Sequence, residues 1–148
     1  MMALYALDTN LYISAIRDGK AASELAQFYA ANAPRCFLIS VVLHELLVGG
    51  KTREKRRQLH ADIAAPFVRT GRIVTPSHQA WVTSGETLSR IAEEERVERS
   101  SFSRSFINDA ILAACCREHG ITLITANLGD FARIERILKF GFTAPWPS

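Results

Sequence analysis

The chain has 148 residues, a length that suits one domain with a substantial core, and we expect a single domain over residues 1–148. Its 48% hydrophobic and 22% charged residues are ordinary for a globular protein, and no apolar run approaches the roughly 20 residues that span a bilayer. The net charge of +3 is too small to indicate a nucleic-acid-binding protein by itself. No basic segment precedes Asp8, so we expect no secretory signal and a cytoplasmic location.

Short apolar strands and longer helices are expected to alternate along the chain. The runs that predict strands cover residues 3–7, 36–40, 71–76 and 121–125, and the tail after residue 138 is compatible with an added edge strand. Helices are expected from about residue 9, then over 20–32, 41–48, 52–65 (stopped by Pro66), 77–95 and 106–118. Strands that are apolar on both faces and separated by helices are typical of a parallel sheet. The sequence therefore predicts an α/β fold with a single parallel β-sheet sandwiched by helices.

The three cysteines, Cys36, Cys115 and Cys116, do not fit a disulfide framework, because their number is odd and the last two are adjacent. The sequence has no Cys-x-x-Cys and no His-x-x-x-His, so it does not indicate a zinc site. We therefore expect buried, reduced thiols.

A carboxylate interrupts the apolar helix "FINDAILAACC" at Asp109, where burial without a partner is costly. Asp8 and Asp130 follow the first and fourth strands, and such folds bind ligands at the carboxyl ends of their strands. Glu45 lies in the early turns of a helix that starts at the same edge, and Asp109 reaches this edge if the loop before its helix rises over it. Four carboxylates on one rim repel one another unless a cation neutralises them. Oxygen ligands without histidine or cysteine suit Mg²⁺ or Mn²⁺.

Each of these acids also has a purely structural interpretation. Asp8 or Asp130 could cap a helix, Asp109 could be stabilised by the positive end of its helix dipole, and Glu45 could be a surface residue. The apolar neighbours of Glu45 leave its helix little polar face, however. Separately the four signals are weak, but their joint placement in an α/β alternation favours a common site.

Four blocks of sequence stand out together: "LDTNLYI" at 7–13, "ISVVLHELLVGG" at 39–50, "INDAILAACC" at 107–116 and "LITANLGDFARI" at 123–134. These blocks resemble the PIN-domain ribonucleases, and among them the VapC-type toxins of bacterial toxin–antitoxin pairs. Their order and the chain length also match, and the resemblance covers nearly the whole chain. It implies a parallel α/β sandwich whose acidic residues hold Mg²⁺ or Mn²⁺ and hydrolyse single-stranded or looped RNA.

The resemblance assigns site residues by position. Asp8, Glu45 and Asp109 fall on the family's three acidic metal-site positions. Thr9 and Thr125 fall on the hydroxyl positions that orient this site. We therefore expect these five residues to meet at one edge of the sheet.

The fourth acid departs from the family pattern, because many members carry an aspartate where Asn127 stands here. Asp130, three residues later, is our candidate for the missing carboxylate, and the departure leaves open whether a second ion binds. An ion held by Asp8 and Asp109 lowers the pKa of a bound water and polarises the scissile phosphate, while Glu45 ligates it or steers the water. The expected products carry a 5′-phosphate and a 3′-hydroxyl.

RNA-binding residues are expected near the rim. The basic stretch at 51–57 is either a solvated helix face or a phosphate-facing patch. Lys51, Arg53 and Arg104 are candidates for holding the RNA backbone, and Phe102 is a candidate for stacking on an unpaired base.

Two protein partners are also expected. We predict a homodimer, because the family usually pairs and because Tyr12, Ile16 and Phe28 on the early helices exceed what one core needs. The resemblance further implies a cognate antitoxin that wraps the toxin and places a basic side chain near the acidic residues, where an arginine could replace the charge of a cation.

Two rival interpretations remain at this point. A receiver-like or flavodoxin-like signalling module also places carboxylates at strand ends, but it normally needs a lysine after a late strand or a glycine-rich phosphate loop, and the sequence has neither. A catalytically inactive PIN-like binding module is the second alternative, and the three intact acidic positions argue against it.

Overall fold

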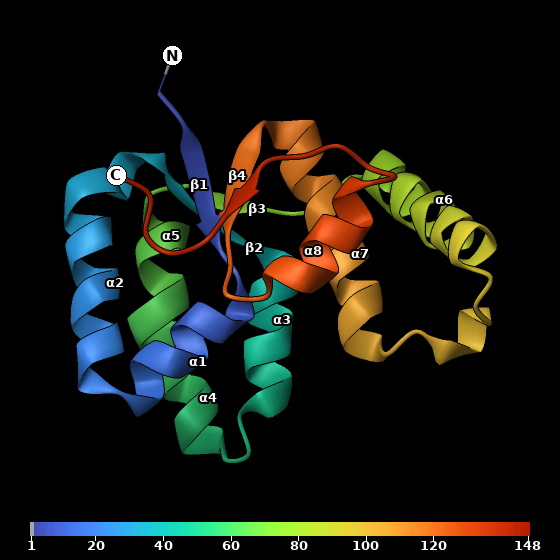
Figure 1. The fold of residues 1–148 in the computed structure, drawn as a ribbon. Coiled ribbons are helices and arrows are strands. Elements are labelled where there is room, and N and C mark those ends of the chain that lie inside the picture. Colours follow the sequence, from blue (N-terminus) through green and yellow to red (C-terminus); the bar gives the residue numbers. More distant parts are fainter. Residues whose placement is uncertain (1) are drawn as a thin grey trace.

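A five-stranded sheet forms the centre of the computed structural model, which describes residues 2–148 (Figure 1). Its strands are β1 (Leu4–Leu7), β2 (Cys36–Ile39), β3 (Ile73–Val74), β4 (Ile121–Ile124) and β5 (Phe142–Thr143). The order across the sheet is β3-β2-β1-β4-β5, and every neighbouring pair is parallel. In the central strand, Ala6 is paired with Phe37 on one side and Leu123 on the other.

Helices cover both faces of this sheet. They are α1 (Thr9–Arg17), α2 (Gly19–Asn32), α3 (Ser40–Gly49), α4 (Arg53–Leu59), α5 (Ala65–Arg69), α6 (His78–Glu95), α7 (Arg104–His119) and α8 (Leu128–Glu135). In Figure 1, α1, α2, α4 and α5 gather on one side of the strands and α6 to α8 on the other. Two faces are covered because the strand order reverses direction after β3, and right-handed crossovers then place the later helices on the opposite face. Within residues 2–148, no helix combines the length and hydropathy needed to cross a membrane.

The predicted fold class is confirmed, since one parallel sheet lies between two layers of helices. The reversal of strand order between β1 and β4 creates a topological switch point, where folds of this kind bind their ligands. Asp8 follows β1 directly, and Thr125 follows β4 directly. The sheet therefore brings residues from the two ends of the chain to one place.

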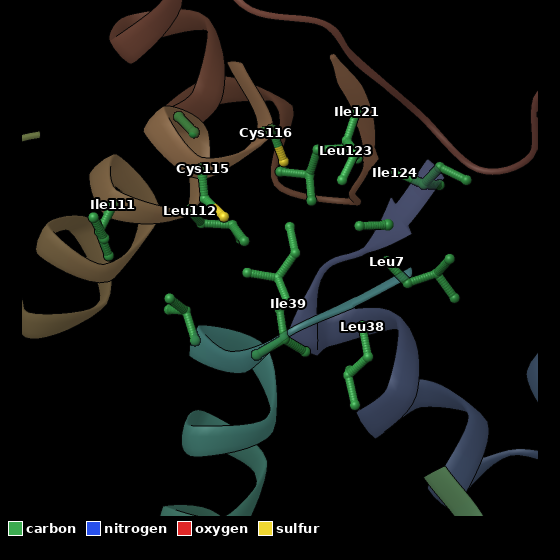
Figure 2. Packing of buried hydrophobic residues seen from close by; sticks show 14 of the residues in the cluster. Leu7, Leu38, Ile39, Ile111, Leu112, Cys115, Cys116, Ile121, Leu123 and Ile124 are labelled. Atoms are coloured by element: carbon green, nitrogen blue, oxygen red, sulfur yellow. The ribbon is translucent and has the colours of Figure 1, made fainter. Parts of the chain in front are cut away.

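Helix α7 runs through the core and is buried along most of its length. Figure 2 shows Leu112, Cys115 and Cys116 projecting from α7 toward strand residues such as Leu123. Each such apolar side chain contributes roughly 1.5–3 kcal/mol on burial. The thiols are free and buried, as predicted. This packing fixes the position of α7 against the sheet, and with it the position of the acid that α7 carries.

The segment after α3 differs from the prediction, because Pro66 does not stop the helix. Arg53–Leu59 continues through a π-helical turn, His60–Ala64, into Ala65–Arg69. Pro66 lies in the first turn of that last helix, where its missing N–H costs little. The wider π-helical turn accommodates the proline without ending the helix.

The apolar residues expected to be exposed on the early helices are mostly buried, so that part of the prediction is wrong. Tyr12 is only 3% exposed and its hydroxyl meets that of Tyr29, while Phe28 is packed against Tyr5 and the C-terminal Trp146. The tail returns across α2 and covers a face that the sequence pattern leaves open. Of the three, only Ile16 is exposed, at 62%.

Candidate active site

Asp8 occupies the end of β1 and is also the N-cap of α1. Its amide donates to the carbonyl of Ile124, which continues the β1–β4 pairing. Its Oδ1 accepts from the amide of Thr9 at 2.8 Å, and its Oδ2 accepts from Asn10 Nδ2 at 3.1 Å and Thr125 Oγ1 at 2.8 Å. These hydrogen bonds fix the orientation of the carboxylate, and its side chain is almost fully buried. Helix capping explains only one of these three contacts.

Glu45 joins the same group through a threonine. It lies on α3, half-buried, and its Oε1 accepts a hydrogen bond from Thr9 Oγ1 at 3.1 Å. Thr9 thus donates its amide to Asp8 and its hydroxyl to Glu45, so one residue links the two acids. Glu45 is thus a half-buried residue that is linked to Asp8.

Asp109 and Asp130 are joined by Asn127, which is the N-cap of α8. Asn127 Nδ2 donates to Asp109 Oδ2 at 3.4 Å and to Asp130 Oδ2 at 3.1 Å. Its amide also donates to Thr125 Oγ1 at 2.9 Å, and Thr125 in turn donates to Asp8. The structure therefore brings together all seven residues expected at the rim: Asp8, Thr9, Glu45, Asp109, Thr125, Asn127 and Asp130.

The electrostatics of this acidic rim are unfavourable without a cation. Burial, together with the charges of Asp8, Glu45 and Asp130, raises the pKa of Asp109 to about 8. Burial also raises the pKa of Asp8, against the opposing hydrogen bonds from Thr125, Thr9 and Asn10. The pKa of Glu45 is raised mainly by burial too. Among the described residues, no lysine, arginine or histidine forms an ion pair with any of the four acids.

The acidic rim offers oxygen donors only, which is the chemistry that a hard divalent ion prefers. Across residues 2–148, no three of its carboxylates have oxygens within 4.8 Å of one another. Hydrogen bonds from Thr9, Thr125 and Asn127 hold them in their separate positions. The residues fit such an ion in number and type, and its binding would draw the side chains closer.

A tighter group of possible ligands, Cys115, Glu118 and His119, lies at the far end of α7. Burial raises the pKa of the Cys115 thiol to about 12, which disfavours the thiolate that binds metals. Both oxygens of Glu118 already accept hydrogen bonds from Ser77, the N-cap of α6. These contacts fasten α6 to α7, and we assign this group a structural role.

The four predicted RNA-binding residues differ in their exposure and in their contacts. Lys51, Arg53 and Arg104 are exposed, and they make no ion pair or side-chain hydrogen bond within residues 2–148. Phe102 is half-buried against Phe106, at a ring-centroid distance of 5.3 Å, and shares a cleft with Asp130. Only Phe102 is therefore brought beside an acid of the rim.

Asn10 is a site residue that is not among the sequence-based candidates. Its Nδ2 donates to Asp8 and also lies 3.4 Å from Thr125 Oγ1, while its Oδ1 accepts from the amide of Ala126. It therefore connects the ends of β1 and β4. An asparagine two residues after a strand-end aspartate is the signal that could have indicated this.

The comparisons with known proteins agree with this geometry. The PIN domain model matches residues 5–137, so the chain belongs to the PIN domain family. No curated protein matches it. Among solved structures, it is similar to DNA-bound VapBC from Salmonella typhimurium, with 22% identity, a TM-score of 0.71, and coverage of 97% of this chain and 98% of that chain.

Two further structures show the same likeness. VapBC2 from Rickettsia felis, bound to a promoter DNA fragment, has 23% identity and a TM-score of 0.63, with 97% and 99% of the two chains covered. VapBC-1 from nontypeable Haemophilus influenzae has 20% identity and a TM-score of 0.64, with 95% and 97% covered. The predicted PIN-domain resemblance is confirmed. The TM-scores and coverages of the three structures show a shared fold along almost the whole chain.

Proposed function

We propose that this chain is a metal-dependent endoribonuclease and the toxin of a type II toxin–antitoxin pair. The observation that carries the proposal is the acidic rim: four carboxylates share one hydrogen-bond network at the switch point of the sheet, and no basic side chain of residues 2–148 pairs with them. A buried group of like charges is stable only if an ion neutralises it or protons remain on it. Membership of the PIN domain family supports the first of these.

Asp8, Glu45 and Asp109 are the proposed ligands of Mg²⁺ or Mn²⁺, and Asp130 is the proposed fourth acid. When bound, such an ion supplies an activated water and a positive charge beside the scissile phosphate. Asn127 would hold Asp109 and Asp130 in place as the neutral member of the group. Ordering of ligands by neighbouring hydrogen bonds commonly contributes 10- to 100-fold in metal affinity or activity.

Hydrolysis then adds water across a phosphodiester bond. Glu45 is the proposed acceptor of the proton from the attacking water, because it is the least buried of the three ligands and its pKa is raised. The water oxygen bonds to phosphorus and the bond to the 3′ oxygen breaks, which leaves a 5′-phosphate and a 3′-hydroxyl. Thr9, which donates to both Asp8 and Glu45, would keep this carboxylate oriented.

The RNA backbone would approach over exposed cations, for which Lys51, Arg53 and Arg104 remain the candidates. Phosphate contacts of this kind position a nucleic acid without reading its sequence. Lys55, on the same helix as Arg53, lines a groove that also contains Glu45, so one edge of this basic helix faces the acidic rim.

The same groove is the proposed binding place of the antitoxin. Its volume is about 1080 Å³, and its lining is largely apolar, with side chains from α1 to α5 that include Leu25, Leu46, Leu59 and Phe67. Glu45 at its edge would receive a basic side chain of the bound segment. If a neutral triple variant at Asp8, Glu45 and Asp109 bound the cognate antitoxin as tightly as the wild type, this mode of inhibition would be wrong.

A homodimer also remains part of the proposal. Ile16 on α1 and Val48 on α3 are exposed apolar residues, at 62% and 68%. Exposed apolar residues that gather on one surface mark interaction sites. Light scattering at micromolar concentration should give twice the chain mass, and a strictly monomeric mass would rule the dimer out.

Cleavage of RNA is the direct test of the nuclease. The purified chain should degrade single-stranded RNA in Mg²⁺ or Mn²⁺, stop when EDTA is added, and leave 5′-phosphate ends. Asp109→Asn should lower the rate by orders of magnitude, whereas Asp62→Asn, at an exposed position outside the acidic rim, should not. Full cleavage by a folded Asp109→Asn protein, purified free of other ribonucleases, would exclude the mechanism.

A further inference from the structure

A second, smaller cleft adjoins the acidic rim, and no role has yet been assigned to it. It has a volume of about 180 Å³ and lies between the start of α7 and α8. Its lining residues are Ser101, Phe102, Ser103, Phe106, Asp130 and Arg133. Asp130 belongs to both places, since it also shares Asn127 with Asp109. A molecule in this cleft would therefore touch the acidic rim.

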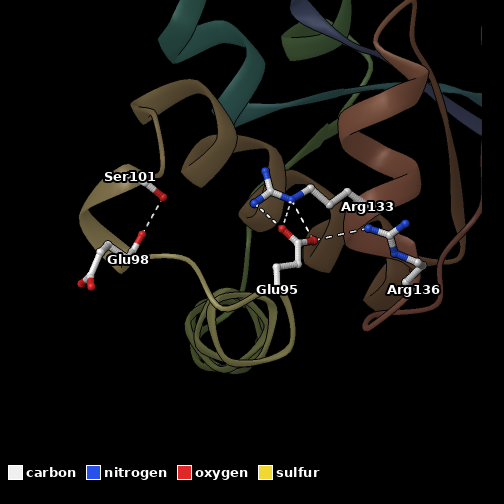
Figure 3. Close-up of polar contacts among 5 residues, drawn as sticks. All are labelled: Glu95, Glu98, Ser101, Arg133 and Arg136. Carbon is white, nitrogen blue, oxygen red and sulfur yellow. Dashed lines mark hydrogen bonds and ion pairs between the residues drawn. The ribbon is translucent and has the colours of Figure 1, made fainter.

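Arg133 is fixed in this cleft by an ion pair. Its Nε donates to both oxygens of Glu95, at 2.8 Å and 3.0 Å, and another of its nitrogens lies 2.6 Å from the same carboxylate. Figure 3 shows Glu95 at the end of α6 facing Arg133 and Arg136 on α8. The remaining terminal nitrogen, Nη1, has no hydrogen-bond partner within residues 2–148. A planar cation is thus held in one orientation, with its Nη1 nitrogen free to donate.

Aromatic rings lie beneath this cation. The centre of the Arg133 guanidinium is 4.3 Å from the ring centroid of Phe106 and 5.5 Å from that of Phe102. Phe106 is buried, but Phe102 is partly exposed at the cleft. Nucleobases stack on aromatic rings and on arginine planes of this kind, and each stacked base contributes substantially to affinity.

The polar groups of the cleft suit a base better than a phosphate. Asp130 uses Oδ2 to accept from Asn127, and its Oδ1 has no hydrogen-bond partner in the described part of the chain. Glu95 already neutralises Arg133 and occupies two of its nitrogens, so a phosphate would meet two carboxylates and only one unoccupied nitrogen of the cation. A free carboxylate oxygen accepts from an exocyclic amine, as Asp and Glu do with cytosine N4. The carbonyl that uracil carries at this position would instead face a negative charge.

Hydrogen bonds within the loop before α7 and at the start of α7 support the wall of this cleft. Ser101 donates its amide and its hydroxyl to the carbonyl of Glu98, as Figure 3 shows for the hydroxyl. Ser103 Oγ accepts from the amide of Phe106 and so caps α7. A preformed pocket loses less entropy on binding than one that must be ordered.

We propose that this cleft is a base subsite of the nuclease, which takes one unpaired, amine-bearing base of the RNA next to the scissile phosphate. The base stacks on Phe102 and on the guanidinium of Arg133, and its amine donates to Oδ1 of Asp130. Glu95 is a positioning residue, because it acts through Arg133. The subsite rests on the proposed function, and it predicts that cytosine is preferred to uracil, since the two differ in the group that faces Asp130.

Binding can be measured without cleavage. The Asp109→Asn protein is titrated with fluorescein-labelled decamers of oligocytidylate, oligouridylate and an abasic ribose chain, in Mg²⁺, by fluorescence anisotropy. Oligocytidylate should bind roughly tenfold more tightly than oligouridylate, and the abasic chain should bind most weakly. Phe102→Leu, which keeps an apolar side chain, should remove most of the difference from the abasic chain. Asp130→Asn should remove the preference for cytidine.

The control is Trp81→Ala, which removes an exposed aromatic ring on α6 outside the cleft and should change none of these ratios. Thermal melting of each variant identifies any loss of fold. Equal affinity for the three decamers, or ratios unchanged in folded Phe102→Leu and Asp130→Asn proteins, would overturn the subsite while leaving the nuclease intact. Absence of binding to every decamer would also overturn the subsite, whereas the nuclease itself is tested separately, by cleavage of RNA by the wild-type chain.

Discussion

The cost of a buried charge explains why Asp109 is informative. Its side chain is 4% exposed, and its neighbours on α7 are almost all apolar. The polar groups around it are the side-chain amide of Asn127, which donates to it, and the carboxylates of Asp8, Glu45 and Asp130. A structural cap would lie in the first turn of the helix, whereas Asp109 is the sixth residue of α7. Ser103 is the residue that caps this helix. The helix-dipole interpretation of Asp109 therefore does not account for its surroundings.

Stability should depend on pH in a direction set by these acids. Because the pKa of Asp109 is about 8 in the folded chain and 3.8 when unperturbed, the folded state holds a proton that the unfolded state loses. The contribution of Asp109 to the stability of the metal-free protein should therefore be greatest below about pH 4, and it should be lost as pH rises to about 8. Asp8 and Glu45, whose pKa values are also raised, act in the same direction.

Melting temperatures between pH 4 and 8.5 in EDTA test this directly. The fall with pH should be shallower in Asp109→Asn, which carries no titrating group at that position. Asp62→Asn is the matched control and should retain the slope of the wild type. A slope identical in Asp109→Asn and the wild type would show that the proton is not held on Asp109.

Asn10 should matter for activity more than for folding. It donates to Asp8 and accepts from the amide of Ala126, so Asn10→Ala removes one of the three hydrogen bonds to the Asp8 carboxylate and leaves that amide without its partner. We expect cleavage of RNA to fall by about 10- to 100-fold, as is typical when the group that orients a metal ligand is removed. Asn32→Ala, which removes a different asparagine, should leave the rate per folded molecule unchanged. A rate within twofold of the wild type for Asn10→Ala would contradict this role.

At the scale of elements, α8 is fastened to α6 by one glutamate. Glu95 pairs with Arg133 and Arg136, and its side chain is 28% exposed. Glu95→Gln should lower the free energy of unfolding by about 1 kcal/mol, because a bidentate ion pair is replaced by weaker hydrogen bonds. Urea denaturation measures this change, and Glu54→Gln, at a pair exposed on both sides, should have almost no effect.

The ion pair of Glu95 and Arg133 should change stability with pH in the direction opposite to that of the acidic rim. Arg133 lowers the pKa of Glu95 below its usual value, so its stabilisation is present above the unfolded pKa and is lost as pH falls through the folded one. The loss on Glu95→Gln should therefore shrink as pH falls below the usual glutamate pKa of 4.5. A loss that is independent of pH would point to packing in place of charge.

Most elements could be predicted from the sequence, because their signals are local. Apolar runs ending at Asp8 and Ile124 define the central strands, and the αL glycine at Gly120 ends α7. Pro66 is an exception, because the sequence predicts that it ends the helix. The π-helical turn that lets the helix continue depends on packing around the helix, which has no local signal in the sequence. The burial of Phe28 depends on a tail that returns from more than a hundred residues away.

The candidate site was predictable to a similar extent. The alternation of strands and helices predicts a parallel sheet, and such sheets bind ligands at the carboxyl ends of their strands. The strand order places Asp8 next to Thr125 at this edge. The bridging role of Asn127 was not predictable, since a neutral residue in an acidic family position looks like a loss. In the fold it donates to two carboxylates, which an aspartate could not do.

At the scale of the whole molecule, the fold concentrates negative charge at one edge while the chain as a whole carries +3. Exposed cations lie on α4 and at the start of α7, and Lys55 on α4 shares a groove with Glu45. In the proposed function, these cations attract the RNA and the acidic rim is where it is cut. This arrangement works only if an ion neutralises the carboxylates, because otherwise they repel the phosphate that must approach them. The central claim is therefore that the acidic rim binds a divalent ion.

Titration of the metal-free protein with Mn²⁺ by isothermal calorimetry, at pH 7, tests that claim most directly. We predict saturable binding that releases protons, because Asp109 must lose its proton to act as a ligand. Asp109→Asn should weaken the binding at least tenfold and remove most of the proton release, while Asp62→Asn should bind as the wild type does. Absence of Mn²⁺ binding by the folded wild-type protein, or binding unchanged in Asp109→Asn, would contradict the account.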